Sequence, residues 1–109
     1  MYLTTFLWAF AMTLAVEVPV LYVVLRRQAS TRLIVVVGVI ANACTLPIVW
    51  FILPLWLGGV AYILGSEIFA IGAESVIIAI AVRVEHRRAL FASIAMNLCS
   101  FLLGAALLR

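Results

Sequence analysis

Three glutamates stand inside long apolar stretches of this chain: Glu17, Glu67 and Glu74. Placing an ionised aspartate at the centre of a membrane helix costs about 2.5–3.5 kcal/mol, so acidic residues in such helices usually face a protein interior and carry function. Two carboxyls that share a site away from water do not both ionise readily. We therefore expect Glu17 and Glu74 to hold at least one proton between them near neutral pH.

Two asparagines occur in a shared pattern, Asn-x-Cys-[Ser/Thr], which runs from Asn42 to Thr45 and from Asn97 to Ser100. In each copy the hydroxyl residue lies three positions after the asparagine, and so on the same face of a helix. Amide, hydroxyl and carboxyl oxygens together suit a cation or a proton. The same groups could instead hold helices together, at about 0.6 kcal/mol each. Both interpretations stay open.

The cysteines and the histidine do not form a metal-binding pattern. Cys44 and Cys99 each lie two residues after an asparagine, which is about 200° around a helix, so we expect them to point away from the asparagine face. No other soft ligand stands near them. The single histidine, His86, lies in a charged loop, which leaves no histidine ligand for a haem within the apolar runs. We predict neither a metal site nor a cofactor.

Four long apolar runs must position these polar residues. The chain has 109 residues, of which 69% are hydrophobic and 10% charged, whereas a soluble domain is about 25% charged. A helix that crosses a bilayer needs about 20 apolar residues, and four such spans fit at 3–25, 33–56, 60–82 and 89–108. Backbone groups in lipid must bond internally, and the connecting loops are short. We predict an all-α integral membrane protein, a four-helix bundle in one domain.

Local signals refine these spans. Ser30 or Thr31 can cap the second helix by accepting hydrogen bonds from its first N–H groups. Pro19, Pro47 and Pro54 are expected to bend their spans, because a proline removes a donor and frees the carbonyl four residues earlier.

The arginines predict the orientation. Six of the seven lie in the loops 26–32 and 83–88, and only Arg109 lies at the other side. Because short loops rich in arginine stay in the cytoplasm, we expect both termini outside. The first apolar run lacks a basic leader and a cleavage site, so it is expected to be a span and not a signal peptide. Arginine without any lysine favours a prokaryotic cytoplasmic membrane.

The two halves of the chain resemble each other. Glu17 and Glu74 are each followed nine residues later by an arginine, at an offset of 57 residues. Asn42 and Asn97, with the surrounding pattern, are 55 residues apart. We predict two repeated helical hairpins, at about 1–57 and 58–109, inserted the same way up and related by a pseudo-two-fold axis along the membrane normal.

Position along the spans converts into depth. Counted from the arginine-rich ends, Glu17, Glu74 and Asn97 lie 8 residues in and Asn42 lies 9 in, or about 12–14 Å at the helical rise. Each span thus contributes one polar residue to a layer at one depth. Glu67 lies two turns further out on the Glu74 face.

The leading functional hypothesis is a proton- or cation-linked transporter or channel. Glu17 and Glu74 would be its titrating pair and Glu67 an outer relay, with ligands at Asn42, Asn97, Thr45 and Ser100. The first alternative is a non-catalytic accessory subunit of a larger membrane complex. The second is an intramembrane enzyme with a glutamate as general base, which is less expected because no second catalytic residue type accompanies it. The expected partners are the lipid bilayer, a cation or proton, and a second copy or another membrane protein. Nucleic acid is not expected, because the arginines form no basic face.

Overall fold

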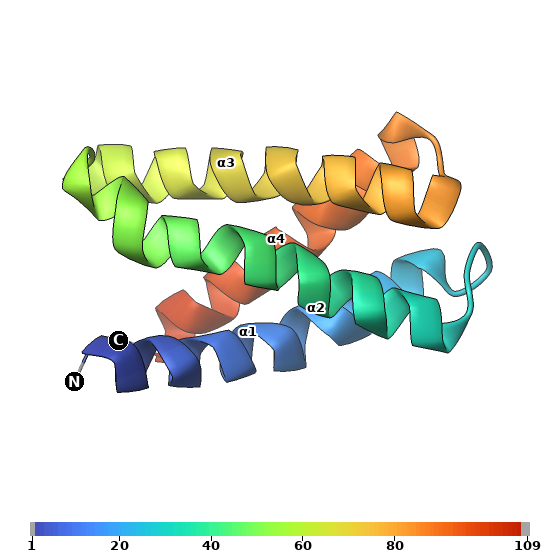
Figure 1. Cartoon of the computed structure of the whole chain (residues 1–109), viewed down its shortest axis with the longest axis horizontal. Helices are drawn as coiled ribbons and strands as arrows, with labels where there is room; N and C mark the ends of the chain where they lie inside the picture. Colours follow the sequence, from blue (N-terminus) through green and yellow to red (C-terminus); the bar gives the residue numbers. More distant parts are fainter. Residues whose placement is uncertain (1, 108–109) are drawn as a thin grey trace.

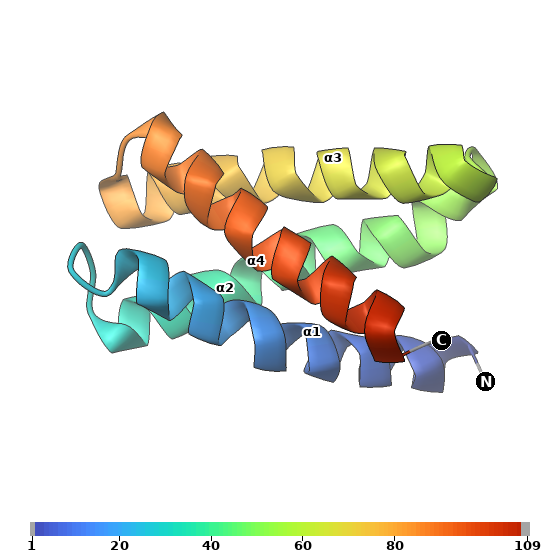
Figure 2. The same ribbon diagram turned by 180° about the vertical axis from the view of Figure 1, so that it is seen from behind.

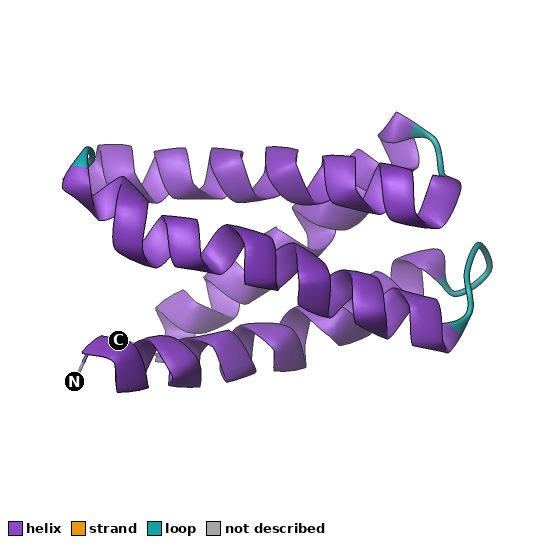
Figure 3. Ribbon diagram, in the orientation of Figure 1, coloured by secondary structure: helices purple, strands orange, loops and turns teal. Residues whose placement is uncertain are grey.

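Long helices account for nearly all of residues 2–107, the part of the chain that the computed structural model describes (Figure 1). The loops are confined to the ends of the bundle (Figure 3). Two helices end in π-helical segments and one short 3₁₀ turn follows the first of these. The elements are α1 (Tyr2–Leu25), α2 (Thr31–Pro47), η1 (Ile48–Ile52), η2 (Leu53–Leu55), α3 (Gly59–Ile78), η3 (Ala79–Arg83) and α4 (His86–Leu107).

Four helical stretches are long and apolar enough to cross a membrane. They are Tyr2–Leu25, Thr31–Leu55, Gly59–Arg83 and His86–Ala106. The longest dimension of the bundle is 38 Å, which exceeds the hydrocarbon core of a bilayer, about 30 Å. Large apolar side chains such as Trp8, Ile68 and Ile80 are exposed on its outside. The prediction of an all-helical chain with four helices able to span a membrane is therefore confirmed, and the chain has the helices of an integral membrane protein.

The helices begin earlier than the apolar runs predict. The second starts at Thr31 instead of residue 33, and the fourth at His86 instead of residue 89. A helix can continue through charged residues once it leaves the hydrocarbon, so the apolar run marks only its lipid-covered part. The predicted cap is present, since Ser30 Oγ accepts a hydrogen bond from the Leu33 N–H (3.2 Å). The predicted end of the last span at Leu108, and Arg109, lie outside the described residues.

The helices form a square in which each packs against two neighbours. α1 packs against α2 and α4, and α3 packs against the same two helices. Seen from behind, α4 crosses the bundle diagonally (Figure 2). The loops at 26–30 and 84–85 lie at one end of the bundle, whereas the start of α1, the end of α4 and the turn at 56–58 lie at the other (Figure 1). The bundle thus has an arginine-rich end and an end with little charge.

The half of the bundle next to the arginine-rich loops holds a closely packed apolar core. The largest side chains in it are fully buried, and alanines and valines fill the space between them. Its buried members are Leu21, Leu25, Ile34, Val37, Ile78, Val82, Ala89, Ala92 and Met96. The polar residues lie on the side of this core that faces away from the arginine-rich end.

The prolines have different effects on their helices. α1 continues through Pro19 as one helix. After Pro47 the chain widens into the π-helical segment η1, in which the Leu53 N–H bonds to the carbonyl of Ile48, five residues earlier. Pro54 lies in η2. Two backbone carbonyls of η1 accept hydrogen bonds from side chains of other helices. The Tyr62 hydroxyl donates to the Val49 carbonyl (2.9 Å), and the Tyr2 hydroxyl donates to the Trp50 carbonyl.

Candidate functional site: a buried polar cavity

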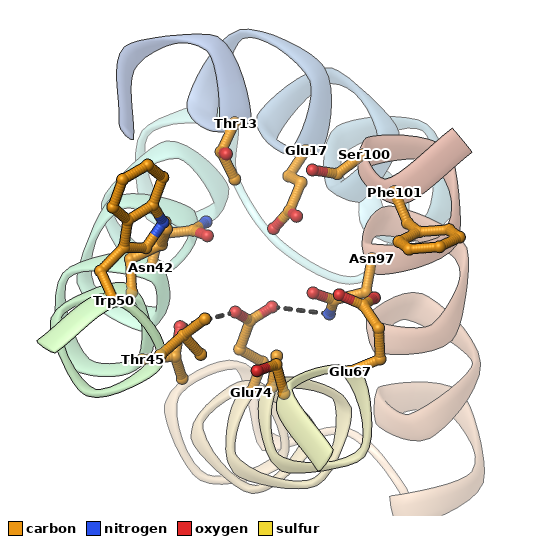
Figure 4. Close-up of a pocket in the computed structure, with 14 residues that line it drawn as sticks. Thr13, Glu17, Asn42, Thr45, Trp50, Glu67, Glu74, Asn97, Ser100 and Phe101 are labelled. Atoms are coloured by element: carbon orange, nitrogen blue, oxygen red, sulfur yellow. Dashed lines mark hydrogen bonds between the residues drawn. The ribbon is translucent and has the colours of Figure 1, made fainter. Parts of the chain in front are cut away.

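A cavity of about 150 Å³ lies in the middle of the bundle, on the side of the apolar core that faces away from the arginine-rich loops (Figure 4). All the residues that the sequence singled out as candidate ligands or proton carriers line it, and every long helix contributes at least one. They are Glu17, Asn42, Thr45, Glu67, Glu74, Asn97 and Ser100. Glu17 and Glu74 are only 2% and 1% exposed. Both carboxyls are therefore shielded from lipid.

Glu74 is held by one hydrogen bond from each side. Thr45 on α2 bonds to Oε2 at 2.8 Å, and the Asn97 amide on α4 donates to Oε1 at 2.9 Å. The carboxyl projects from α3 between these two helices (Figure 4). Glu74 thus connects three helices at one point, and we call it and its two partners the Glu74 clasp.

Hydrogen counting shows what the Glu74 clasp can hold. The Thr45 hydroxyl has one proton, yet its oxygen lies within bonding distance of both the Ala41 carbonyl (3.0 Å) and Glu74 Oε2. The Asn97 amide spends its two protons on Glu74 and on the Ser93 carbonyl (2.9 Å). A proton on Glu74 Oε2 would let it donate to Thr45, which could then donate to Ala41. The clasp is therefore built to accommodate a neutral carboxyl.

Glu17 faces the Glu74 clasp from the opposite wall and is less completely hydrogen-bonded than Glu74. Its Oε1 is buried and has no hydrogen-bond partner among the described residues. The Asn42 amide and the Ser100 hydroxyl are the polar side chains that interact with this carboxyl, and the Asn42 amide donates to the Gly38 carbonyl at 3.0 Å. Because a buried acceptor without a donor is costly, Oε1 is the atom best suited to accept a proton or a hydrogen bond from a ligand.

The remaining polar wall adds further acceptors. Glu67 lines the cavity and is half-buried. Ser66 Oγ is buried and, within residues 2–107, has no hydrogen-bond partner. The described residues that line the cavity include three carboxyls and no basic side chain. Its chemistry is therefore that of an oxygen-rich site for a positively charged species.

Sequence reasoning missed the three other lining residues that have a polar atom in the side chain: Thr13, Ser66 and Trp50. Two of them carried a usable signal. Thr13 lies four residues before Glu17, and Ser66 lies eight before Glu74, so both share a helix face with a buried glutamate. Trp50 lies eight residues after Asn42, but the π-helical segment η1 breaks the α-helical register between them, so that spacing does not predict its position.

The cysteines lie on the outside of the bundle. Cys44 and Cys99 are exposed and carry free thiols, as their angular offset from the asparagines predicts. Within the described chain, no group of three His, Cys, Asp or Glu side chains is arranged to hold a metal ion.

Comparison with known proteins adds no assignment to this geometry. No known protein family, curated protein or solved structure matches the chain.

Proposed function

We propose that this protein moves a proton or a small cation across the membrane, with Glu17 and Glu74 as the carboxyls that bind it. One observation carries the proposal. Two buried carboxyls face one cavity, and one of them is fully bonded while an oxygen of the other has no partner within residues 2–107. Such a pair can pass a proton or cation between two states of unequal bonding.

The other polar groups would act as ligands. The Asn97 amide donates to a carboxyl and a backbone oxygen, and the Asn42 amide donates to a backbone oxygen. The amide carbonyl oxygens of both would face a cation. Thr45 and Ser100 would add hydroxyl oxygens. Glu67 is half-buried and lies two helical turns from Glu74, toward the less charged end. It would relay the ion between the cavity and that end.

The packed apolar core would serve as the closed gate. It lies between the cavity and the arginine-rich loops, and its largest members, including Leu21, Leu25 and Ile34, are fully buried. An ion could pass only if the packing there changed. In this proposal the structure would represent a state closed toward the arginine-rich end.

We further propose that the two hairpins, 1–57 and 58–109, are repeats of one ancestral unit. Buried positions of the first hairpin are matched by buried positions of the second at the same offsets of 57 and 55 residues. The matched pairs are Glu17 with Glu74, Leu21 with Ile78, Gly38 with Ser93, Ala41 with Met96 and Asn42 with Asn97. The polar partners also correspond. Glu74 is bonded by Asn97 of its own hairpin and Thr45 of the other, while Glu17 interacts with Asn42 of its own hairpin and Ser100 of the other. A pseudo-two-fold axis along the membrane normal would relate them.

The proposed orientation places the arginine-rich loops in the cytoplasm of a prokaryotic cell and both termini outside. It follows from the retention of short arginine-rich loops, and these loops share one end of the bundle (Figure 1). The cavity would then lie between the cytoplasmic gate and the outer surface.

Flux measurements on reconstituted protein test the transport function. Liposomes with an imposed pH or cation gradient should show a flux that depends on pH. In a Glu17→Gln, Glu74→Gln double variant the flux should fall about tenfold or more, because a hydrogen bond to a charged group is worth about 1.5–3 kcal/mol and the variant removes both carboxylates. Glu85→Gln, an exposed carboxyl in the inner loop, is the matched control and should leave the flux unchanged. Undiminished flux in the double variant would refute the role of the pair.

One observation favours a second function, an accessory subunit of a larger membrane complex. The Glu74 clasp is complete without any ligand, as a purely structural fastening would be, and the bundle exposes much apolar surface to potential partners. Stable co-purification with another membrane protein at fixed stoichiometry, together with no flux from the isolated chain, would favour this function over transport.

A further inference from the structure

A second, mainly apolar groove adjoins the polar cavity. It measures about 390 Å³ and lies between α1, α4 and η1, with walls that include Trp8, Met12, Val16 and Leu103. Thr13, Trp50 and Ser100 line both the groove and the polar cavity. The two spaces therefore meet at these three residues.

The polar cavity is shaped for a small head group. At about 150 Å³ it holds only a few water-sized groups, since water occupies about 30 Å³ in the liquid. Among the described residues its unpartnered buried atoms are Glu17 Oε1, a carboxyl oxygen that can accept, and Ser66 Oγ, a hydroxyl that can accept or donate. A group that carries N–H donors and a positive charge would satisfy them. An anionic head would meet the carboxyls of Glu17 and Glu67 with no basic side chain among the lining residues of the described chain.

The groove suits a hydrocarbon chain. It is more than twice as large as the polar cavity, and apart from the shared residues its walls are mostly hydrocarbon. The aromatic ring of Trp50 stands where the two meet, and such a ring attracts a cation on its face. A tail that left the polar cavity at Trp50 would enter an apolar space directly.

We infer that the joined spaces bind an amphiphile with a protonated primary amine head and an unbranched alkyl tail. The head would lie in the polar cavity against Glu17, and the tail in the groove between α1 and α4. The inference rests on the proposed function in one respect, because it names the class of cation that the cavity takes.

Tryptophan quenching by brominated amphiphiles tests this site. A Trp8→Phe, Trp56→Phe variant keeps Trp50 as its single reporter, since the chain has three tryptophans. In phosphatidylcholine nanodiscs, 8-bromooctylamine should quench Trp50 saturably. Its half-saturation concentration should be about tenfold or more below that of the neutral 8-bromooctanol, the ratio that one ionic hydrogen bond supplies. A Trp8→Phe, Trp50→Phe variant reports from Trp56, which is 81% exposed, and should show only unsaturable partitioning.

Two further variants locate the head and the tail. Glu17→Gln should raise the half-saturation concentration of the amine to that of the alcohol. Gly104→Leu should fill the groove, because Gly104 lines it and a Cβ atom there meets no protein atom within 4 Å, and should weaken amine binding about tenfold. Gly72→Leu is its matched control, a helical glycine with equal room that lines neither space, and should leave binding unchanged. Should Glu17→Gln fail to fold, the two glycine variants still decide the question.

The outcomes separate this inference from the transport function. Unsaturable quenching of Trp50, or amine binding unaffected by Gly104→Leu, overturns the amphiphile site. If Glu17-dependent flux of protons or small cations persists in that case, the proposed function stands without it. Saturable amine binding that needs Glu17 and an open groove, in a protein with no flux, supports the site and overturns transport.

Discussion

Glu17 and Glu74 lie at matching positions of the two proposed repeats but are hydrogen-bonded to different extents. Glu74 bonds to Thr45 and Asn97, whereas Glu17 keeps one buried oxygen without a donor among residues 2–107. In the proposed transport function, this difference in bonding would give the two carboxyls different affinities for the same proton or cation.

Substitution of Glu74 tests whether the Glu74 clasp holds a neutral carboxyl. Glu74→Gln should change the free energy of unfolding by less than about 1 kcal/mol, because its amide can donate to Thr45 while its carbonyl accepts from Asn97. Glu74→Ala should lower it by about 2–4 kcal/mol, since it leaves a void and an unpaired N–H of Asn97. Unfolding titrations in mixed detergent micelles measure both. Equal destabilisation by the two variants would mean that the clasp needs an ionised acceptor.

At this scale the sequence predicts which residues meet, but not how they bond. Counting residues along the spans placed Glu17, Asn42, Glu74 and Asn97 at one depth, and all four line one cavity. The partner of each depends on sub-ångström differences in helix rotation, which sequence spacing does not contain. The bond from Thr45 to Glu74, across 29 residues of chain, could not have been chosen over one to Glu17.

Among the elements, η1 has the most unusual geometry. Its wider turns follow Pro47, and two tyrosines from other helices bond to its carbonyls. The rings of Phe6 and Trp50 also pack at 5.7 Å between centroids. These contacts fix the position of Trp50, and with it the junction between the polar cavity and the apolar groove.

Removal of the Tyr62 hydroxyl tests how much this anchoring contributes. Tyr62→Phe should lower the free energy of unfolding by about 0.5–1.5 kcal/mol, because the Val49 carbonyl loses its donor. Tyr22→Phe is the control, a more exposed tyrosine on α1 for which no hydrogen bond is found within the described residues, and should cost less than about 0.5 kcal/mol. The same detergent titrations compare them. A Tyr62→Phe variant as stable as its control would remove this role from the hydroxyl.

Element type and order follow from composition, whereas the π-helical segments do not. The apolar runs predict four helices, and Pro47 predicts a disturbance that the structure has as η1. The second π-helical segment, η3 (Ala79–Arg83), contains no proline, so the sequence does not predict it. It ends at Arg83, which has a positive φ of 61°. A positive φ is uncommon for residues other than glycine, so this conformation could not be predicted from an arginine.

In the whole molecule, charge is distributed unequally between the two ends of the bundle, and this distribution is the basis for predicting the orientation. The prediction of two repeats and a fixed orientation follows from the arrangement of arginines and polar residues along the chain. Hydropathy alone could not supply it, because all four spans are similarly apolar.

Cysteine labelling tests the orientation. In a Cys44→Ser, Cys99→Ser background, Gly58→Cys should react with a membrane-impermeant maleimide on intact bacterial cells. Gln28→Cys should react only after the cells are permeabilised. Both positions are exposed, and a side chain at Gly58 meets no atom within 4 Å. The opposite pattern would invert the topology, and labelling of both on intact cells would mean that the chain inserts in two directions.

The Glu74 clasp also constrains how the protein is made. Asn97 follows Glu74 by 23 residues, so it is still inside or near the ribosome when the third helix enters the bilayer. Until the last helix arrives, one carboxyl oxygen lacks its amide and the core lacks Ala89, Ala92 and Met96. A chain interrupted at that stage would present an unpaired carboxyl oxygen and an unfilled seam to the lipid.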